Sequence, residues 1–137
     1  MREIVFRGKR TVGGEWVEGA FAPHAHPVNA YIIRHGSTLW VQVDPETVGQ
    51  YTGLNDRNGR KIFEGDVCEV HWAPPGRKPV RLRYSVVYSK SGFFFKDTTV
   101  MGQVSNYTNV GPYLFVEVIG NIHDNPELLT CREENLQ

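Results

Sequence analysis

Two histidines separated by one residue are the first candidates for chemistry in this chain. His24 and His26 point the same way if their segment is a strand, and such a pair can share a metal ion. Further ligands would have to come from His35, His71, His123 or Asp44. None of these stands at a recognised ligand spacing, and Pro23 and Pro27 favour a solvated loop. The sequence therefore predicts no metal and no cofactor, and a metal-dependent enzyme using His24 and His26 is a minor alternative.

A cationic and aromatic stretch is the second candidate. No acid lies between Glu69 and Asp97, whereas six cations do: Arg77, Lys78, Arg81, Arg83, Lys90 and Lys96. Small β-barrels bind nucleic acid with cations on the phosphates and aromatic rings stacked on bases. The residues proposed for such contacts are Arg81, Arg83, Lys90, Lys96 and, if its strand lies at a sheet edge, Trp72.

A structural interpretation of the same stretch is favoured over nucleic-acid binding. Tyr84 and Tyr88 fall on the apolar side of an alternating pattern, which predicts that both are core residues. Arg81 and Arg83 would then form an ordinary solvated face, and Glu69 or Glu117 on neighbouring strands could neutralise it. The neutral total of fifteen Lys plus Arg against fifteen Asp plus Glu also disfavours a cationic coat.

Acidic residues beside turn signals form the third candidate group. Asp56, Glu64, Asp66 and Asp124 each neighbour a glycine, asparagine or proline, where carboxylates serve as turn and cap residues. The chain has no Ser–His–Asp order, phosphate loop or nucleophile elbow. The sequence therefore predicts no catalytic residues and no enzyme.

The elements that must position these residues are mostly strands. Alternation is clearest over residues 80–88 and 68–72, while 114–119 is apolar on both faces and is predicted to be a central strand. Shorter strands are expected at 4–7, 15–21, 31–34, 39–43 and 92–96. Helix starts at Asp44-Pro45-Glu46 and Asn125-Pro126-Glu127 predict one turn and a short C-terminal helix over about 126–132.

Length and composition set the class of protein. The chain has 137 residues, 40% of them hydrophobic, which suits one folded domain with a core of its own. Its two cysteines form no zinc spacing, and Cys68 is expected to be a buried thiol. The longest stretch without charge, residues 98–116, is too polar to span a membrane. We expect a soluble protein in the cytoplasm of a bacterial host cell, with no membrane partner.

Three segments resemble the YopX family. Residues 43–67 are similar to its signature, roughly QYTGLKDKNGKEIYEGDIV, and residues 118–129 are similar to its closing VIGNIYENPELL. The start, residues 2–9 and 14–19, also fits. The resemblance implies a small protein encoded by a bacteriophage or prophage, and it brings no activity and no catalytic residues. Residues 24–37 and 74–108, which hold the histidine pair and most of the cationic stretch, match least.

The signature itself is interpreted as structural. The residues concerned are Tyr51, Thr52, Gly53, Leu54, Asn58, Gly59, Glu64, Gly65 and Asp66. Asn58-Gly59 is a strong hairpin signal, and 64–66 is typical of a strand-entry corner in SH3-like barrels. Residues 50–54 could build a binding corner or a packed loop that locks the N-terminal strands onto the barrel, and packing is favoured.

These observations predict one mainly β domain over residues 1–137. An N-terminal strand group, 1–49, packs on an SH3-like barrel, 50–137, with a short C-terminal helix. The leading hypothesis for function is a non-enzymatic phage or prophage accessory protein that binds a host or phage macromolecule. A nucleic-acid-binding barrel is the first alternative, and self-association through sheet edges stays open.

Overall fold

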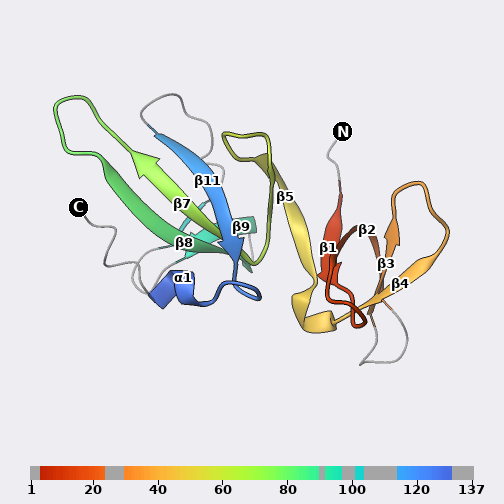
Figure 1. Cartoon of the computed structure of the whole chain (residues 1–137). Helices are drawn as coiled ribbons and strands as arrows, with labels where there is room; N and C mark the ends of the chain where they lie inside the picture. Colours follow the sequence, from red (N-terminus) through yellow and green to blue (C-terminus); the bar gives the residue numbers. More distant parts are fainter. Residues whose placement is uncertain (1–3, 24–29, 90–91, 97–100, 104–113, 131–137) are drawn as a thin grey trace. The chain divides into compact units, whose positions relative to one another are not determined.

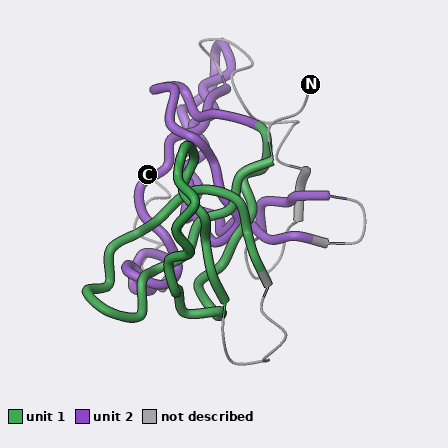
Figure 2. The backbone as a smooth tube through the Cα atoms, turned by 90° about the vertical axis from the view of Figure 1, so that its right-hand side faces the viewer, with its two compact units in different colours: residues 1–53 green, residues 54–137 purple. Residues whose placement is uncertain are grey.

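The computed structural model describes residues 4–23, 30–89, 92–96, 101–103 and 114–130 (Figure 1). The described residues form a mainly β protein with two antiparallel sheets, one 3-10 turn and one short α-helix, as the sequence predicts. The chain divides into two compact units, Met1–Gly53 and Leu54–Gln137 (Figure 2). The sequence placed its subregion boundary between residues 49 and 50.

Unit 1 is built on a meander of antiparallel strands. Its elements are β1 (Phe6–Lys9), β2 (Trp16–Pro23), β3 (Ala30–Arg34), β4 (Trp40–Val43), η1 (Pro45–Thr47) and most of β5 (Gly49–Asn55), whose last two residues belong to unit 2. In the six-stranded sheet these strands run in the order β4-β3-β2-β1-β5-β6, where β6 (Lys61–Phe63) follows the Asn58-Gly59 turn. The core of the unit consists of Val17, Ala30, Ile32 and Val43. Gly13 and Gly14 adopt positive φ at the β1–β2 turn, where side-chain-bearing residues would be strained.

Unit 2 carries a five-stranded sheet in the order β10-β9-β8-β7-β11. Its strands are β7 (Asp66–Trp72), β8 (Val80–Ser89), β9 (Gly92–Lys96), β10 (Met101–Gln103) and β11 (Leu114–Asn121). Alternate residues of the four strands β7, β8, β9 and β11 supply most of the core, which is made of Ile62, Cys68, Val70, Tyr84, Val86, Phe93, Phe95, Val116 and Val118. The period-two pattern in the sequence therefore separates a core face from a second face. The SH3-like assignment of this region stays a prediction.

Two predictions about strands were wrong, because the pairing of a strand depends on residues far away in the sequence. Residues 50–54 are not a loop but the body of β5, which pairs with β1 through Phe6–Gln50 and Arg7–Gly49. β11 is not central in its sheet, since it pairs with β7 at the end of the strand order. Its other edge is covered at Val116 and Val118 by the turn that follows β5. That cover satisfies backbone groups at the free edge of β11, and the Arg57 guanidinium covers Phe115 on its outer face.

The two helix starts predicted from the sequence, at Asp44-Pro45-Glu46 and Asn125-Pro126-Glu127, are confirmed. Asp44 caps the 3-10 turn η1, its Oδ1 accepting a hydrogen bond from the Glu46 N–H at 3.0 Å. α1 spans Glu127–Thr130, shorter than predicted, and residues 131–137 lie outside the described part. No helix in the described ranges has the length and apolar character needed to cross a bilayer.

Candidate functional site

One face of the unit 2 sheet gathers polar and charged side chains from three neighbouring strands. We call it the charged face and define it by Glu69, His71, Arg81, Arg83, Phe115 and Glu117. In the register of the sheet, His71 stands opposite Arg81 on one side and opposite Phe115 on the other. Glu69 stands in the same way between Arg83 and Glu117. Two rows of three residues therefore cross β8, β7 and β11 side by side.

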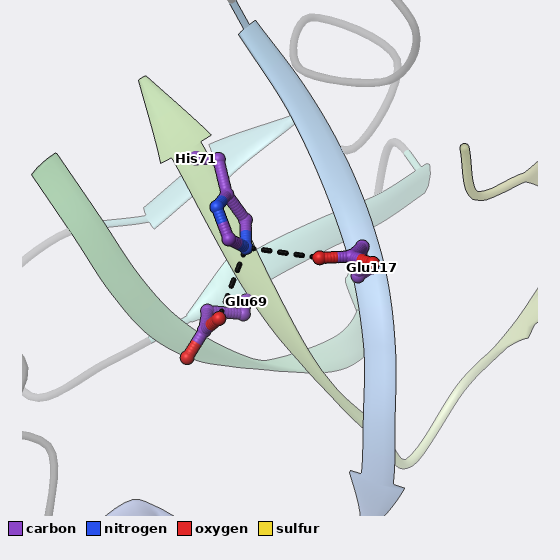
Figure 3. A group of neighbouring side chains, drawn as sticks. All are labelled: Glu69, His71 and Glu117. Carbon is purple, nitrogen blue, oxygen red and sulfur yellow. Dashed lines mark ion pairs between the residues drawn. The ribbon is translucent and has the colours of Figure 1, made fainter. Parts of the chain in front are cut away.

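Three side chains converge at the centre of the charged face. His71 Nε2 lies 3.0 Å from Glu69 Oε1 and 3.1 Å from Glu117 Oε1 (Figure 3). The side chains are 19%, 12% and 33% exposed, in the order His71, Glu69, Glu117. Nε2 is buried, and despite the short distances it has no partner with hydrogen-bond geometry among the described residues. The two carboxylate oxygens thus flank the nitrogen without lying in line with its N–H direction.

The second oxygen of each carboxylate faces outward from this centre. Arg83 Nε lies 3.7 Å from Glu69 Oε2, and Asn58 Nδ2 donates a hydrogen bond of 3.4 Å to Glu117 Oε2. Arg83 also donates from Nη1 to the Leu128 carbonyl of the α1 helix at 3.1 Å. Arg81 is more loosely placed: its Nη1 is 4.0 Å from Glu69 Oε1, and 57% of the side chain is exposed.

Stacked groups hold the His71 ring. The rings of His71 and Phe115 lie 4.6 Å apart at an interplanar angle of 17°. The Arg57 guanidinium covers Phe115, with its carbon 3.9 Å from the ring centre. Phe115 therefore has partners against it already and is not open for stacking on a base.

The turn that carries Arg57 and Asn58 is anchored to β11 by a buried carboxylate. Asp56 is 3% exposed, and its Oδ1 accepts hydrogen bonds from the N–H groups of Asn58 and Arg60, both at 2.9 Å. Its Oδ2 accepts from the Val118 N–H at 3.0 Å, and the Arg57 N–H donates to the Val116 carbonyl at 3.0 Å. The turn is thereby fastened beside the charged face.

The chain shares its sequence pattern with a known family and its fold with a solved structure. The chain matches the model of the family described as YopX protein over residues 14–130, which is more than half of its length. The chain belongs to the YopX family. It is also similar to a solved structure, the crystal structure of protein EF1440 from Enterococcus faecalis, with 26% identity and a TM-score of 0.58. That match covers 94% of this chain and 99% of the other. Among curated proteins, no sequence matches this chain.

The residues of the YopX signature lie mostly in buried or turn positions. Tyr51 and Thr52 are each 6% exposed within β5, Asp66 is 1% exposed, and Leu54 packs against the unit 2 core. Gly53, Gly59 and Gly65 all adopt positive φ. Asp66 Oδ2 accepts a hydrogen bond of 2.7 Å from the Phe63 N–H. Asn58 is exposed and Glu64 half-buried. The structural interpretation of the signature stays a prediction.

The five residues predicted for nucleic-acid contact do not all lie on one face of the sheet. Arg81 and Arg83 share the charged face, and Lys96 joins them because it stands opposite Ser85, two residues beyond Arg83. Trp72 is 48% exposed, but it stands opposite Val80 and so projects from the other face, on a strand inside the sheet. Lys90, like His24 and His26, lies outside the described residues.

Two other sequence interpretations can be compared with the structure. Tyr84 is buried as predicted, but the prediction for Tyr88 was wrong, since it is 59% exposed although its ring lies against Phe93. Glu69 does pair with the arginines, as its position suggested. The convergence of Glu69, His71 and Glu117 was missed. The spacing of Glu69 and His71, two residues apart on one strand, was a usable signal.

Proposed function

We propose that this YopX protein is a non-enzymatic binding module, and that the charged face binds the phosphate backbone of a nucleic acid. The observation that carries the proposal is the exposure of the charged side chains on this face and beside it. Arg57, Arg81 and Lys96 are exposed, whereas Glu69 and Glu117 are half-buried between them. An approaching polyanion therefore meets cations first, and phosphate contacts supply most non-specific affinity.

The same geometry predicts how such binding would behave. Phe115 is covered and Trp72 projects from the other face, so neither of these two rings is offered for base stacking beside the phosphate contacts. Affinity should therefore vary little with base sequence and fall steeply with salt. Arg83 is held by Glu69 and the Leu128 carbonyl, so it contributes less than Arg81.

The remaining parts of the proposal concern the setting. The phage or prophage origin rests on the YopX membership, which covers residues 14–130. A cytoplasmic place in the bacterial host would give the module access to intracellular DNA and RNA. The absence of a nucleophile motif from the sequence supports a binding role in preference to catalysis.

Fluorescence polarisation with labelled single- and double-stranded DNA and RNA tests the proposal. At about 50 mM salt, where phosphate contacts are strong, we expect micromolar binding. Arg81→Ala and Lys96→Ala should each weaken binding to every oligonucleotide and lower the salt slope by about 1. Arg34→Ala is the matched control, because Arg34 is an exposed arginine at the end of β3 in unit 1. No micromolar binding, or an equal loss in Arg34→Ala, would refute the assignment.

A further inference from the structure

We propose that Glu69, His71 and Glu117 bind one divalent transition-metal ion through His71 Nε2 and the Oε1 atoms of the two carboxylates. The three ligand atoms lie within 4.8 Å of one another. Glu69 and His71 come from β7 and Glu117 from β11, and the three side chains point toward one another (Figure 3). This inference goes beyond nucleic-acid binding and does not depend on it.

The distances between the ligand atoms suit a single ion. Bonds of about 2.1 Å place neighbouring ligands about 3.0 Å apart around an octahedral ion and about 3.4 Å apart around a tetrahedral one. Nε2 lies 3.0 and 3.1 Å from the two oxygens, close to the octahedral value. Ordinary hydrogen bonds could give the same distances, but they would place an oxygen in line with the N–H group.

The second observation is the state of the His71 nitrogen. Nε2 is buried and has no hydrogen-bond geometry toward any partner among the described residues, although two carboxylate oxygens flank it. An unsatisfied buried nitrogen costs free energy. An ion placed between Nε2 and the two oxygens would accept the lone pair of the neutral ring and remove that cost.

The surroundings keep the ligand atoms aimed at the common point. Arg83 and Asn58 contact the outer oxygens of Glu69 and Glu117, which leaves each Oε1 directed inward. The Phe115 ring fixes the plane of His71 by stacking. Groups of this kind, which orient ligands without binding the ion, typically change metal affinity by about 10- to 100-fold when they are removed.

Arg81 opposes the ion, and this opposition provides a test. Its guanidinium lies 4.0 Å from Glu69 Oε1 but is largely exposed, so it can turn toward solvent when an ion binds. A unit charge about 6 Å from a divalent ion, in a water-like dielectric at physiological salt, weakens binding by about threefold. Arg81→Ala should therefore strengthen metal binding by about threefold while it weakens nucleic-acid binding.

The ligand set also selects among ions. One imidazole and two carboxylates suit Zn²⁺, Mn²⁺ and Co²⁺ better than Mg²⁺, because Mg²⁺ prefers oxygen ligands and water. Three protein ligands leave open positions for water or for an anionic oxygen. We expect Zn²⁺ to bind more tightly than Mn²⁺, in the usual order of divalent ions.

Isothermal titration of the full chain with Zn²⁺ and Mn²⁺, without nucleic acid, tests the site. We expect one ion per chain, and a loss of affinity of at least about tenfold in His71→Ala and Glu117→Gln. Glu64→Gln is the matched control, because Glu64 is a half-buried carboxylate of unit 2 outside the three ligands. It should bind as the parent does, and so should a double His24→Ala, His26→Ala variant.

Co²⁺ supplies a second readout, because its visible absorption reports its ligands. The band should appear in the parent chain and disappear in Glu117→Gln, a conservative change that keeps the shape of the side chain. Circular dichroism establishes that each variant is folded. The inference is overturned if the parent binds no stoichiometric ion, or if binding survives His71→Ala and is lost in the His24 and His26 variant. Failure here leaves the nucleic-acid titration unaffected, so the two proposals fail separately.

Discussion

Replacing Asp56 by alanine probes the contact that joins the YopX signature to the charged face. Its carboxylate is 3% exposed and accepts three backbone hydrogen bonds, from Asn58, Arg60 and Val118. Asn58 and Arg60 are exposed residues, so water can replace the carboxylate at their N–H groups. Val118 is only 8% exposed, and its N–H would be left without an acceptor.

The expected loss of stability follows from these differences. Two turn hydrogen bonds that water can partly replace contribute about 0.5 kcal/mol each, and the loss of a charged acceptor from a buried N–H costs about 2 kcal/mol. Asp56→Ala should therefore lower the free energy of unfolding by about 3 kcal/mol and the melting temperature by about 10 °C. Asp56→Asn keeps one acceptor oxygen for the turn but not the second for Val118, so about 2 kcal/mol should be lost.

Urea unfolding followed by far-ultraviolet circular dichroism measures these changes, with the slope compared between variants. Asp44→Ala is the matched control, because Asp44 also accepts a backbone hydrogen bond but is exposed and caps only η1. Its loss should cost about 1 kcal/mol. The reasoning is refuted if Asp56→Ala lowers the free energy of unfolding no more than Asp44→Ala does. The buried hydrogen bond to Val118 would then contribute nothing measurable to stability.

Two further substitutions test other contacts. Gly19→Ala should destabilise the protein by at least about 2 kcal/mol, because the added Cβ would lie 2.0 Å from the Ile33 carbonyl oxygen. Thermal unfolding checks this against Gly36→Ala, where nothing lies within 4 Å and only the positive φ should cost about 1 kcal/mol. Phe115→Leu should weaken Zn²⁺ binding by about tenfold although no ligand is removed, because the ring that orients His71 is lost. Unchanged affinity in the titration would show that the stack does not position the histidine.

The edges of the two sheets illustrate why some predictions failed. The apolar pattern of residues 114–119 is the same whether a neighbouring strand or a turn covers the strand, so the pattern could not identify β11 as an edge strand. The cover comes from Asp56, 62 residues away in the chain. Likewise, residues 49–55 form the strand β5 because they pair with β1. The amino-acid types of a short polar segment indicate a strand only weakly.

The sequence by itself determined which side chains share a face. Period-two alternation is local, so it placed Arg81 with Arg83, and Glu69 with His71, and it separated both pairs from Val70 and Tyr84. Local signals also located the Asp44 cap and the Asn58-Gly59 turn.

Only the tertiary structure decided which strands are neighbours. Placing β11 beside β7 brings Glu117, 46 positions later in the chain, within 3.1 Å of His71. That choice depends on how the apolar faces of all the strands pack into one core, and no short stretch of sequence contains that information.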